Sequence, residues 1–126
     1  MKFPDDLKYT KEHEWISVQG KIGTIGVTDY AQGELGDVVF IDFASDKTNV
    51  KLGDSIGTIE AVKTVSDIYA PCSGKLVEVN NHLQTNPEVV NSDPYGLGWM
   101  VKIELTDPSE LNSLLNSTDY KVLVGK

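Results

Sequence analysis

The chain has 126 residues, a length that suits one globular domain with a single hydrophobic core. Nineteen acidic residues against eleven basic ones give a formal charge of −8, which disfavours binding to nucleic acid or to an anionic membrane. The longest apolar run, "VVFI", is too short to span a bilayer, and the N-terminal residues lack the apolar stretch of a secretory signal. The net charge favours a soluble monomer. The single cysteine excludes an internal disulfide and fits a reducing compartment, for which we expect the cytoplasm, with an organelle matrix after removal of a leader as the alternative.

Short segments of β character dominate the first hundred residues. Residues 13–29 predict two strands joined by a turn at Gln19-Gly20, and Thr28 then caps a short helix that ends at Gly36. The next segment, "DVVFIDF", has almost no polar interruption, so we expect a strand that is buried on both faces. Two further strands, "SIGTIEA" and "TVSDIYA", precede a turn from Pro71 to Gly74 and a strand over "KLVEVN".

The last third of the chain combines one strand with one helix. Apolar residues alternate with Met100, Lys102 and Glu104 from Trp99 to Leu105, as in a half-buried strand. Asp107-Pro108-Ser109-Glu110 then predicts the start of a helix, which an apolar stripe of Leu111, Leu114 and Leu115 would dock on the sheet. Many short strands with one or two small helices favour a compact barrel or sandwich.

The usual signatures of an enzyme are missing. The glycines of "GKIGTIG" fit neither a dinucleotide fingerprint nor a phosphate-binding loop, and "HEWIS" lacks the second histidine of a zinc protease. His13 and His82 have no ligand cluster around them in the sequence, which disfavours a metal site. Cys72 has no basic neighbour that would lower its pKa, so we interpret it as a packing residue.

Lys63 is the one basic residue between Lys51 and Lys75. A chain reversal over "AVKT" would pair the flanking strands and place Lys63 at the tip of a hairpin. Most lysines are solvated surface charges, and position alone favours that interpretation. The same geometry also suits an amine that another enzyme must reach and acylate.

Five stretches of the chain resemble the family of glycine cleavage system H proteins, which are lipoyl carriers. They run from about Leu7 to the C-terminal helix and read "KYTKEHEW", "TIGVTDYAQGELGDVVFIDF", "GTIEAVKTVSDIYAPCSGKLVEVN", "NPEVVNSDPYGLGW" and "LLNSTDYK". The resemblance implies one lipoyl-binding domain of the H-protein type over residues 1–126. It also implies a mainly β fold, a flattened barrel of the barrel-sandwich hybrid, lipoyl-domain-like type, with short helices that include one at the C-terminus.

The resemblance places lipoate on Lys63. The family's attachment motif is similar to Glu-Ser-Val-Lys-Ala, whereas this chain has Glu60-Ala61-Val62-Lys63-Thr64. The two departures are small residues that a turn accepts. Biotin carriers flank their lysine with methionines, which are absent here, so biotin is disfavoured. We further hypothesise that Glu60, a fixed charge beside the turn, helps the lipoate-attaching enzyme to recognise the hairpin.

The family's partners follow from the resemblance. A pyridoxal-phosphate glycine decarboxylase places an aminomethyl group on the lipoyl arm, an aminomethyltransferase passes its carbon to tetrahydrofolate, and dihydrolipoamide dehydrogenase reoxidises the arm. The protein is then a carrier and not an enzyme. The lipoyl group supplies the thiol exchange, and a lysine that bears it extends about 15 Å at ordinary bond lengths.

Two acidic residues match family positions that line the cleft for the loaded arm. Without the resemblance, Glu14 and Asp67 would both be interpreted as exposed strand acids. With it, we expect them to hold a cationic amine through charge-assisted hydrogen bonds. Glu34 lies where some members have a histidine that contacts the arm, and we do not count it as a site residue. Trp15 and Trp99 are interpreted as core anchors.

Two alternatives stay open at this point. The chain could be a lipoyl or octanoyl relay protein of the same family, serving other lipoate-dependent complexes. It could also be a small β-barrel interaction module whose lysine is never modified. Loading by purified decarboxylase distinguishes the first alternative, and the intact mass of the native protein distinguishes the second.

Overall fold

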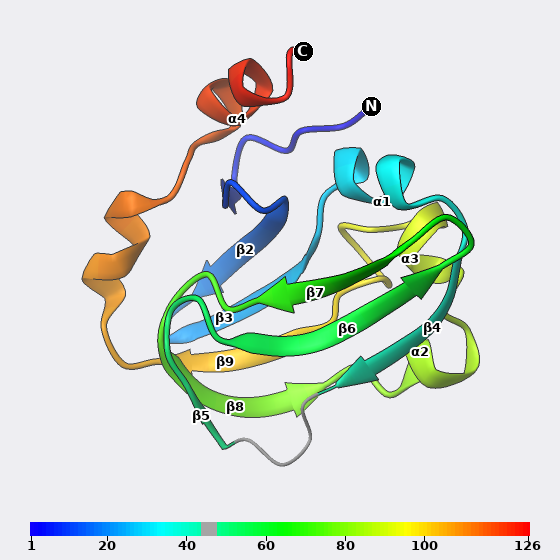
Figure 1. The fold of residues 1–126 in the computed structure, drawn as a ribbon. Helices are drawn as coiled ribbons and strands as arrows, with labels where there is room; N and C mark the ends of the chain where they lie inside the picture. Colours follow the sequence, from blue (N-terminus) through cyan, green and yellow to red (C-terminus); the bar gives the residue numbers. More distant parts are fainter. Residues whose placement is uncertain (44–47) are drawn as a thin grey trace.

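The structure is a computed structural model that describes residues 1–43 and 48–126, and it is mainly β (Figure 1). A six-stranded antiparallel sheet has the order β1-β2-β3-β9-β8-β5, and a three-stranded antiparallel sheet has the order β4-β6-β7. The larger sheet contains β1 (Lys8–Tyr9), β2 (Glu14–Gln19), β3 (Ile22–Val27), β5 (Asn49–Val50), β8 (Gly74–Val79) and β9 (Val101–Leu105). The smaller sheet contains β4 (Val38–Phe43), β6 (Ser55–Ala61) and β7 (Val65–Tyr69). The expected mainly β, lipoyl-domain-like class is therefore confirmed, as two stacked sheets.

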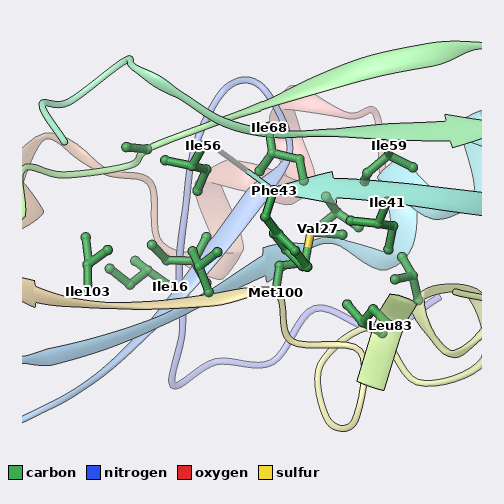
Figure 2. Packing of buried hydrophobic residues seen from close by; sticks show 14 of the residues in the cluster. Ile16, Val27, Ile41, Phe43, Ile56, Ile59, Ile68, Leu83, Met100 and Ile103 are labelled. Atoms are coloured by element: carbon green, nitrogen blue, oxygen red, sulfur yellow. The ribbon is translucent and has the colours of Figure 1, made fainter. Parts of the chain in front are cut away.

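The main core fills the space between the two sheets (Figure 2). Ile41, Ile59 and Ile68 of the smaller sheet are almost completely buried, and they share this cluster with Ile16 and Ile103 of the larger sheet. Full burial of each such side chain contributes about 1.5–3 kcal/mol. The apolar contact between the sheets thus holds β6 and β7, with the hairpin between them, on the rest of the molecule.

A second buried cluster attaches the chain termini to the outer side of the larger sheet. It consists of Leu7, Tyr9, Trp15 and Tyr120, with Phe3 packed against it. The rings of Tyr9 and Tyr120 are stacked at a centroid distance of 4.7 Å. As a result, the N-terminal segment and the C-terminal helix lie side by side (Figure 1).

The helices are short and lie at the edges of the sheets. They are α1 (Asp29–Leu35), α2 (His82–Thr85), α3 (Val89–Ser92), the 3-10 helix η1 (Pro108–Ser113) and α4 (Ser117–Leu123). Helix α1 begins and ends as predicted, because the Thr28 hydroxyl accepts a hydrogen bond from Ala31 N and Gly36 follows at φ +80°. None of the helices in the described ranges is long and apolar enough to cross a membrane.

Two predictions for the first half of the chain need correction. The turn between β2 and β3 falls at Gly20-Lys21, one residue later than predicted. Strand β4 is not buried on both faces, since Val39 and Phe40 are 54% and 44% exposed. The pairing of β4 with β6 shifts register between Val38 and Phe40. This irregularity turns two consecutive apolar side chains outward, and the described helices leave that face of the smaller sheet open to water.

The C-terminal predictions were partly wrong. The segment after Asp107 forms a 3-10 helix, Leu114 is extended, and Leu115 bridges to Tyr9, so the leucines do not share one helical face. Leu111 and Leu114 nevertheless pack against the main core as expected. Helix α4 is a separate element. Asn116 caps its start, because the Asn116 side chain accepts a hydrogen bond from Asp119 N. Met100 precedes β9 and is fully buried, so the predicted alternation does not extend to it.

Candidate functional site

The reversal predicted over "AVKT" is present, and it is a tight hairpin between β6 and β7. Glu60 pairs with Val65, and Ala61 N donates a hydrogen bond to Thr64 O at 2.9 Å, which leaves Val62 and Lys63 as the turn. Both turn residues are exposed. Neither has a positive φ angle, and this explains how the turn forms without glycine or asparagine.

The hairpin is held by the segment that follows α1. Val62 N donates to Asp37 O at 2.9 Å. The aliphatic stem of Lys63 lies against Gly36, where a Cβ atom would be 3.3 Å from Lys63 Cγ and Cδ. Asn91 in turn fixes this segment, since its Nδ2 donates to Gly36 O and its Oδ1 accepts from Val38 N. Lys63 is therefore presented from a supported turn, and within the described ranges no carboxylate lies within ion-pairing distance of its Nζ.

A cleft of about 170 Å³ lies next to this hairpin, between α1 and the first residues of β7. Its lining includes side chains from α1, from the adjoining ends of β2 and β3, and from the hairpin strands. The lining residues are Glu12, His13, Glu14, Val27, Ala31, Glu34, Leu35, Ile59, Ser66 and Asp67. The structure thus brings Glu14, Asp67 and Glu34 to one cleft, as the resemblance implied.

Glu14 is a buried acid and not an exposed one. It lies on the same face of β2 as the core residue Ile16, and only 2% of it is exposed. Its Oε1 accepts from Thr10 Oγ1 at 2.6 Å, and its Oε2 accepts from Tyr69 N at 3.2 Å. Burial raises the pKa of Glu14 to about 7, although both hydrogen bonds oppose the shift. The cleft therefore contains a carboxylate for which a nearby cation would be especially favourable.

The other acids occupy exposed positions. Asp67 Oδ1 accepts from Thr58 Oγ1 at 3.2 Å, and the two residues are directly paired across β6 and β7. Asp67 therefore lies at the rim of the cleft, whereas Glu14 lies inside it. Glu34 is an exposed residue of α1 at the same cleft. Glu60 is exposed on β6, three residues before Lys63.

His13 connects the cleft to two helices, a connection that was not predicted. Its Nδ1 lies 2.9 Å from the Tyr120 hydroxyl, which lies 2.7 Å from the Thr28 hydroxyl that caps α1. Burial lowers the pKa of His13, which favours the neutral imidazole. His13 is also the one non-glycine residue with a positive φ angle in the described part of the chain. Tyr120 is 107 positions away, and no local pattern in the sequence indicates this contact.

Of the three residues that were assigned to packing, Cys72 and Trp15 are buried and Trp99 is only half-buried. Cys72 is fully buried, and burial, reinforced by the nearby Glu110 carboxylate, raises the pKa of its thiol to about 12. Trp15 is buried in the second cluster and donates from Nε1 to Pro94 O at 3.1 Å. Trp99 is half-buried at the edge of that cluster, with the Lys102 ammonium 4.9 Å from the centre of its ring. Among the described residues, no group of histidine, cysteine and acidic side chains is arranged to hold a metal ion.

Comparison with known proteins gives consistent results along the chain. A family model described as "Glycine cleavage H-protein" matches residues 7–126. The chain is 52% identical to the glycine cleavage system H protein of Staphylococcus haemolyticus (strain JCSC1435) over 126 residues, which is 100% of both chains. It is 49% identical to that of Staphylococcus carnosus (strain TM300), again over the full length of both. The crystal structure of a glycine cleavage system H protein from Mycobacterium marinum matches with a TM-score of 0.88 at 36% identity, covering 98% of this chain and 99% of that one.

Proposed function

The chain belongs to the glycine cleavage H-protein family, and from this premise we propose that it is the lipoyl carrier of the glycine cleavage system. In this proposal the 126 residues form one lipoyl-binding domain that acts as a monomer. It is a shared substrate of glycine decarboxylase, aminomethyltransferase and dihydrolipoamide dehydrogenase, after a lipoate-attaching enzyme has modified it. The protein itself catalyses none of these steps.

The observation that carries the proposal is the presentation of Lys63. Its amine is exposed at the tip of a hairpin whose turn is hydrogen-bonded to Asp37 and packed on Gly36. An acylating enzyme can therefore reach the amine without unfolding the chain. The adjacent cleft offers a place for the cargo at the end of an arm about 15 Å long.

The residues of the cleft fit a cationic cargo. When attached through an amide to Lys63 Nζ, lipoate supplies the disulfide and dithiol chemistry by which an aminomethyl group is accepted and released. Glu14 inside the cleft and Asp67 at its rim are the acceptors that we assign to the ammonium group of this cargo. The apolar side chains of Val27, Leu35 and Ile59 shelter it from water, which would otherwise release it before the next enzyme arrives.

The test is to modify the chain with a purified lipoate-attaching enzyme and to map the modified peptide. We expect the intact mass to rise by one lipoyl group, located on Lys63. A Lys63→Arg variant keeps the positive charge, cannot be acylated in this way, and should fold with an unchanged melting temperature. Modification of Lys51 or Lys75 in the parent chain would contradict the assignment. Loading of the modified protein by purified glycine decarboxylase then distinguishes a glycine cleavage carrier from a relay to other complexes.

A further inference from the structure

The outer face of the smaller sheet exposes a group of apolar side chains beside Lys63. Val39, Phe40, Val62 and Val65 are exposed by 54%, 44%, 72% and 61%. They come from β4, from the turn and from β7, and the register brings these segments together at one end of the sheet. Isolated surface valines need no explanation, but several exposed apolar side chains gathered at one end of one sheet are a feature of interaction sites.

The strand register makes these residues neighbours. Phe40 is directly paired with Glu60, and Glu60 is directly paired with Val65, so the three side chains form one row across β4, β6 and β7. The register shift between Val38 and Phe40 adds Val39 to the same exposed surface. We call Val39, Phe40, Val62 and Val65, together with Glu60, the hairpin surface.

Acidic groups surround the hairpin surface. Two positions along the strands from Glu60, the next row on the same face of the sheet pairs Asp42 with Thr58 and Thr58 with Asp67. Asp37 lies on the opposite side, next to the turn. Strands β4, β6 and β7 contain no lysine or arginine, and within the described ranges Lys63 is the cation of this surface. A complementary partner therefore has an apolar recess with a basic rim.

We propose that the hairpin surface is the docking surface for the enzyme that acylates Lys63. This inference rests on the proposed function and adds Phe40 and Val65 as the residues that the enzyme contacts on either side of Glu60. Before acylation the chain has no arm, so that enzyme has only the protein surface to recognise. Phe40 and Val65 flank the residue three positions before Lys63, so an active site that encloses the amine covers this row as well.

The experiment compares acylation of the parent chain with that of a Phe40→Thr/Val65→Thr variant. Threonine is β-branched and suits a strand, and both positions are exposed, so the fold should be retained with little change in melting temperature. The matched control is Val77→Thr/Leu97→Ser, which removes two exposed apolar side chains outside the smaller sheet. The rate is followed by intact mass with a purified lipoate-attaching enzyme, lipoate and ATP.

We expect kcat/KM for acylation to fall by about 10-fold or more in the hairpin-surface variant, as for truncation of central interface residues, and to be unchanged in the control. We also expect KM of the parent to rise with salt, and to rise less steeply in Glu60→Gln. Equal rates for the parent and the hairpin-surface variant would overturn the inference while leaving the carrier function intact. Failure of the parent itself to be acylated on Lys63 would instead overturn the proposed function.

Two further outcomes would assign the surface to another occupant. The hairpin-surface variant could be acylated normally and yet be loaded poorly by glycine decarboxylase. The surface would then be a docking site for the decarboxylase, and our assignment to the acylating enzyme would be wrong. Sedimentation could show that the parent chain is a dimer and the variant a monomer, which would identify the occupant as a second copy of the chain.

Discussion

Replacement of Glu14 by glutamine tests whether the cleft holds a carboxyl group that is protonated near neutral pH. Burial raises the pKa of Glu14 from 4.5 to about 7 in the folded protein. The folded chain therefore binds more protons than the unfolded chain between these two values, and its free energy of unfolding falls as the pH rises through this range. The stability linked to Glu14 is fully present below pH 4.5 and is lost once the pH has passed about 7.

The magnitude follows from the separation of the two pKa values. Each pKa unit corresponds to about 1.4 kcal/mol, so the linked change is at most about 3.5 kcal/mol. Glutamine has the same shape and can still accept from Tyr69 N, but its amide nitrogen then faces Thr10 Oγ1, whose O–H loses the carboxylate oxygen to which it donates. That mismatch costs about 1 kcal/mol. At pH 8 we therefore expect Glu14→Gln to be about 2 kcal/mol more stable than the parent, whereas at pH 4.5 it should be slightly less stable.

Urea unfolding at half-unit steps from pH 4.5 to 8.5 measures this difference. Glu104→Gln is the control, because it makes the same chemical change at an exposed strand position. The difference between Glu14→Gln and the parent should grow with pH and level off above pH 8, while the control difference stays flat. Parallel curves for Glu14→Gln and the parent would show that Glu14 titrates near its ordinary value, which would refute the argument that burial raises its pKa.

Three other outcomes are expected. Glu60→Gln should slow lipoylation and leave the melting temperature nearly unchanged, because Glu60 is exposed, and equal rates would remove Glu60 from the site. A Glu14→Gln/Asp67→Asn variant, once loaded, should release ammonia and formaldehyde faster than the parent in the absence of the transferase, and identical release would make both acids bystanders. Gly36→Ala should cost about 1 kcal/mol in urea unfolding, because Gly36 has φ +80° and a methyl group there would press on the stem of Lys63, while unchanged stability would show that this contact is loose.

The hairpin around Lys63 could be predicted because its signal is local. Residues 55–61 and 65–69 both have a strand pattern, and the short segment between them leaves room for only a turn. The ends of α1 were equally local, since Thr28 and Gly36 act through contacts within a few residues. These features needed no knowledge of the rest of the fold.

The environment of Glu14 could not be predicted in the same way. Its burial depends on Tyr69, which is 55 positions away, and on the smaller sheet that covers the end of β2. Likewise, the outward direction of Val39 and Phe40 depends on a register shift against β6, which the run "VVFI" does not reveal. The spacing of the leucines at 111, 114 and 115 is that of a helical stripe, so one helix was predicted there and α4 was not recognised as a separate element. In the structure Leu114 is extended. Long-range pairing decided the burial of Glu14 and the direction of Val39 and Phe40, whereas the start of α4 has a local signal, the Asn116 cap, that the helical interpretation of the leucines concealed.

Two contacts of the turn bear on when Lys63 can be modified. They are the hydrogen bond from Val62 to Asp37 and the contact of Lys63 with Gly36. An isolated two-stranded hairpin is at best marginally stable in water. The turn that presents Lys63 therefore takes its shape only after the segment that follows α1 has packed against it. A chain that is still emerging from the ribosome, or that has misfolded, has the same sequence around Lys63 without the folded hairpin. An enzyme that selects this shape would modify folded molecules and pass over those that have not folded.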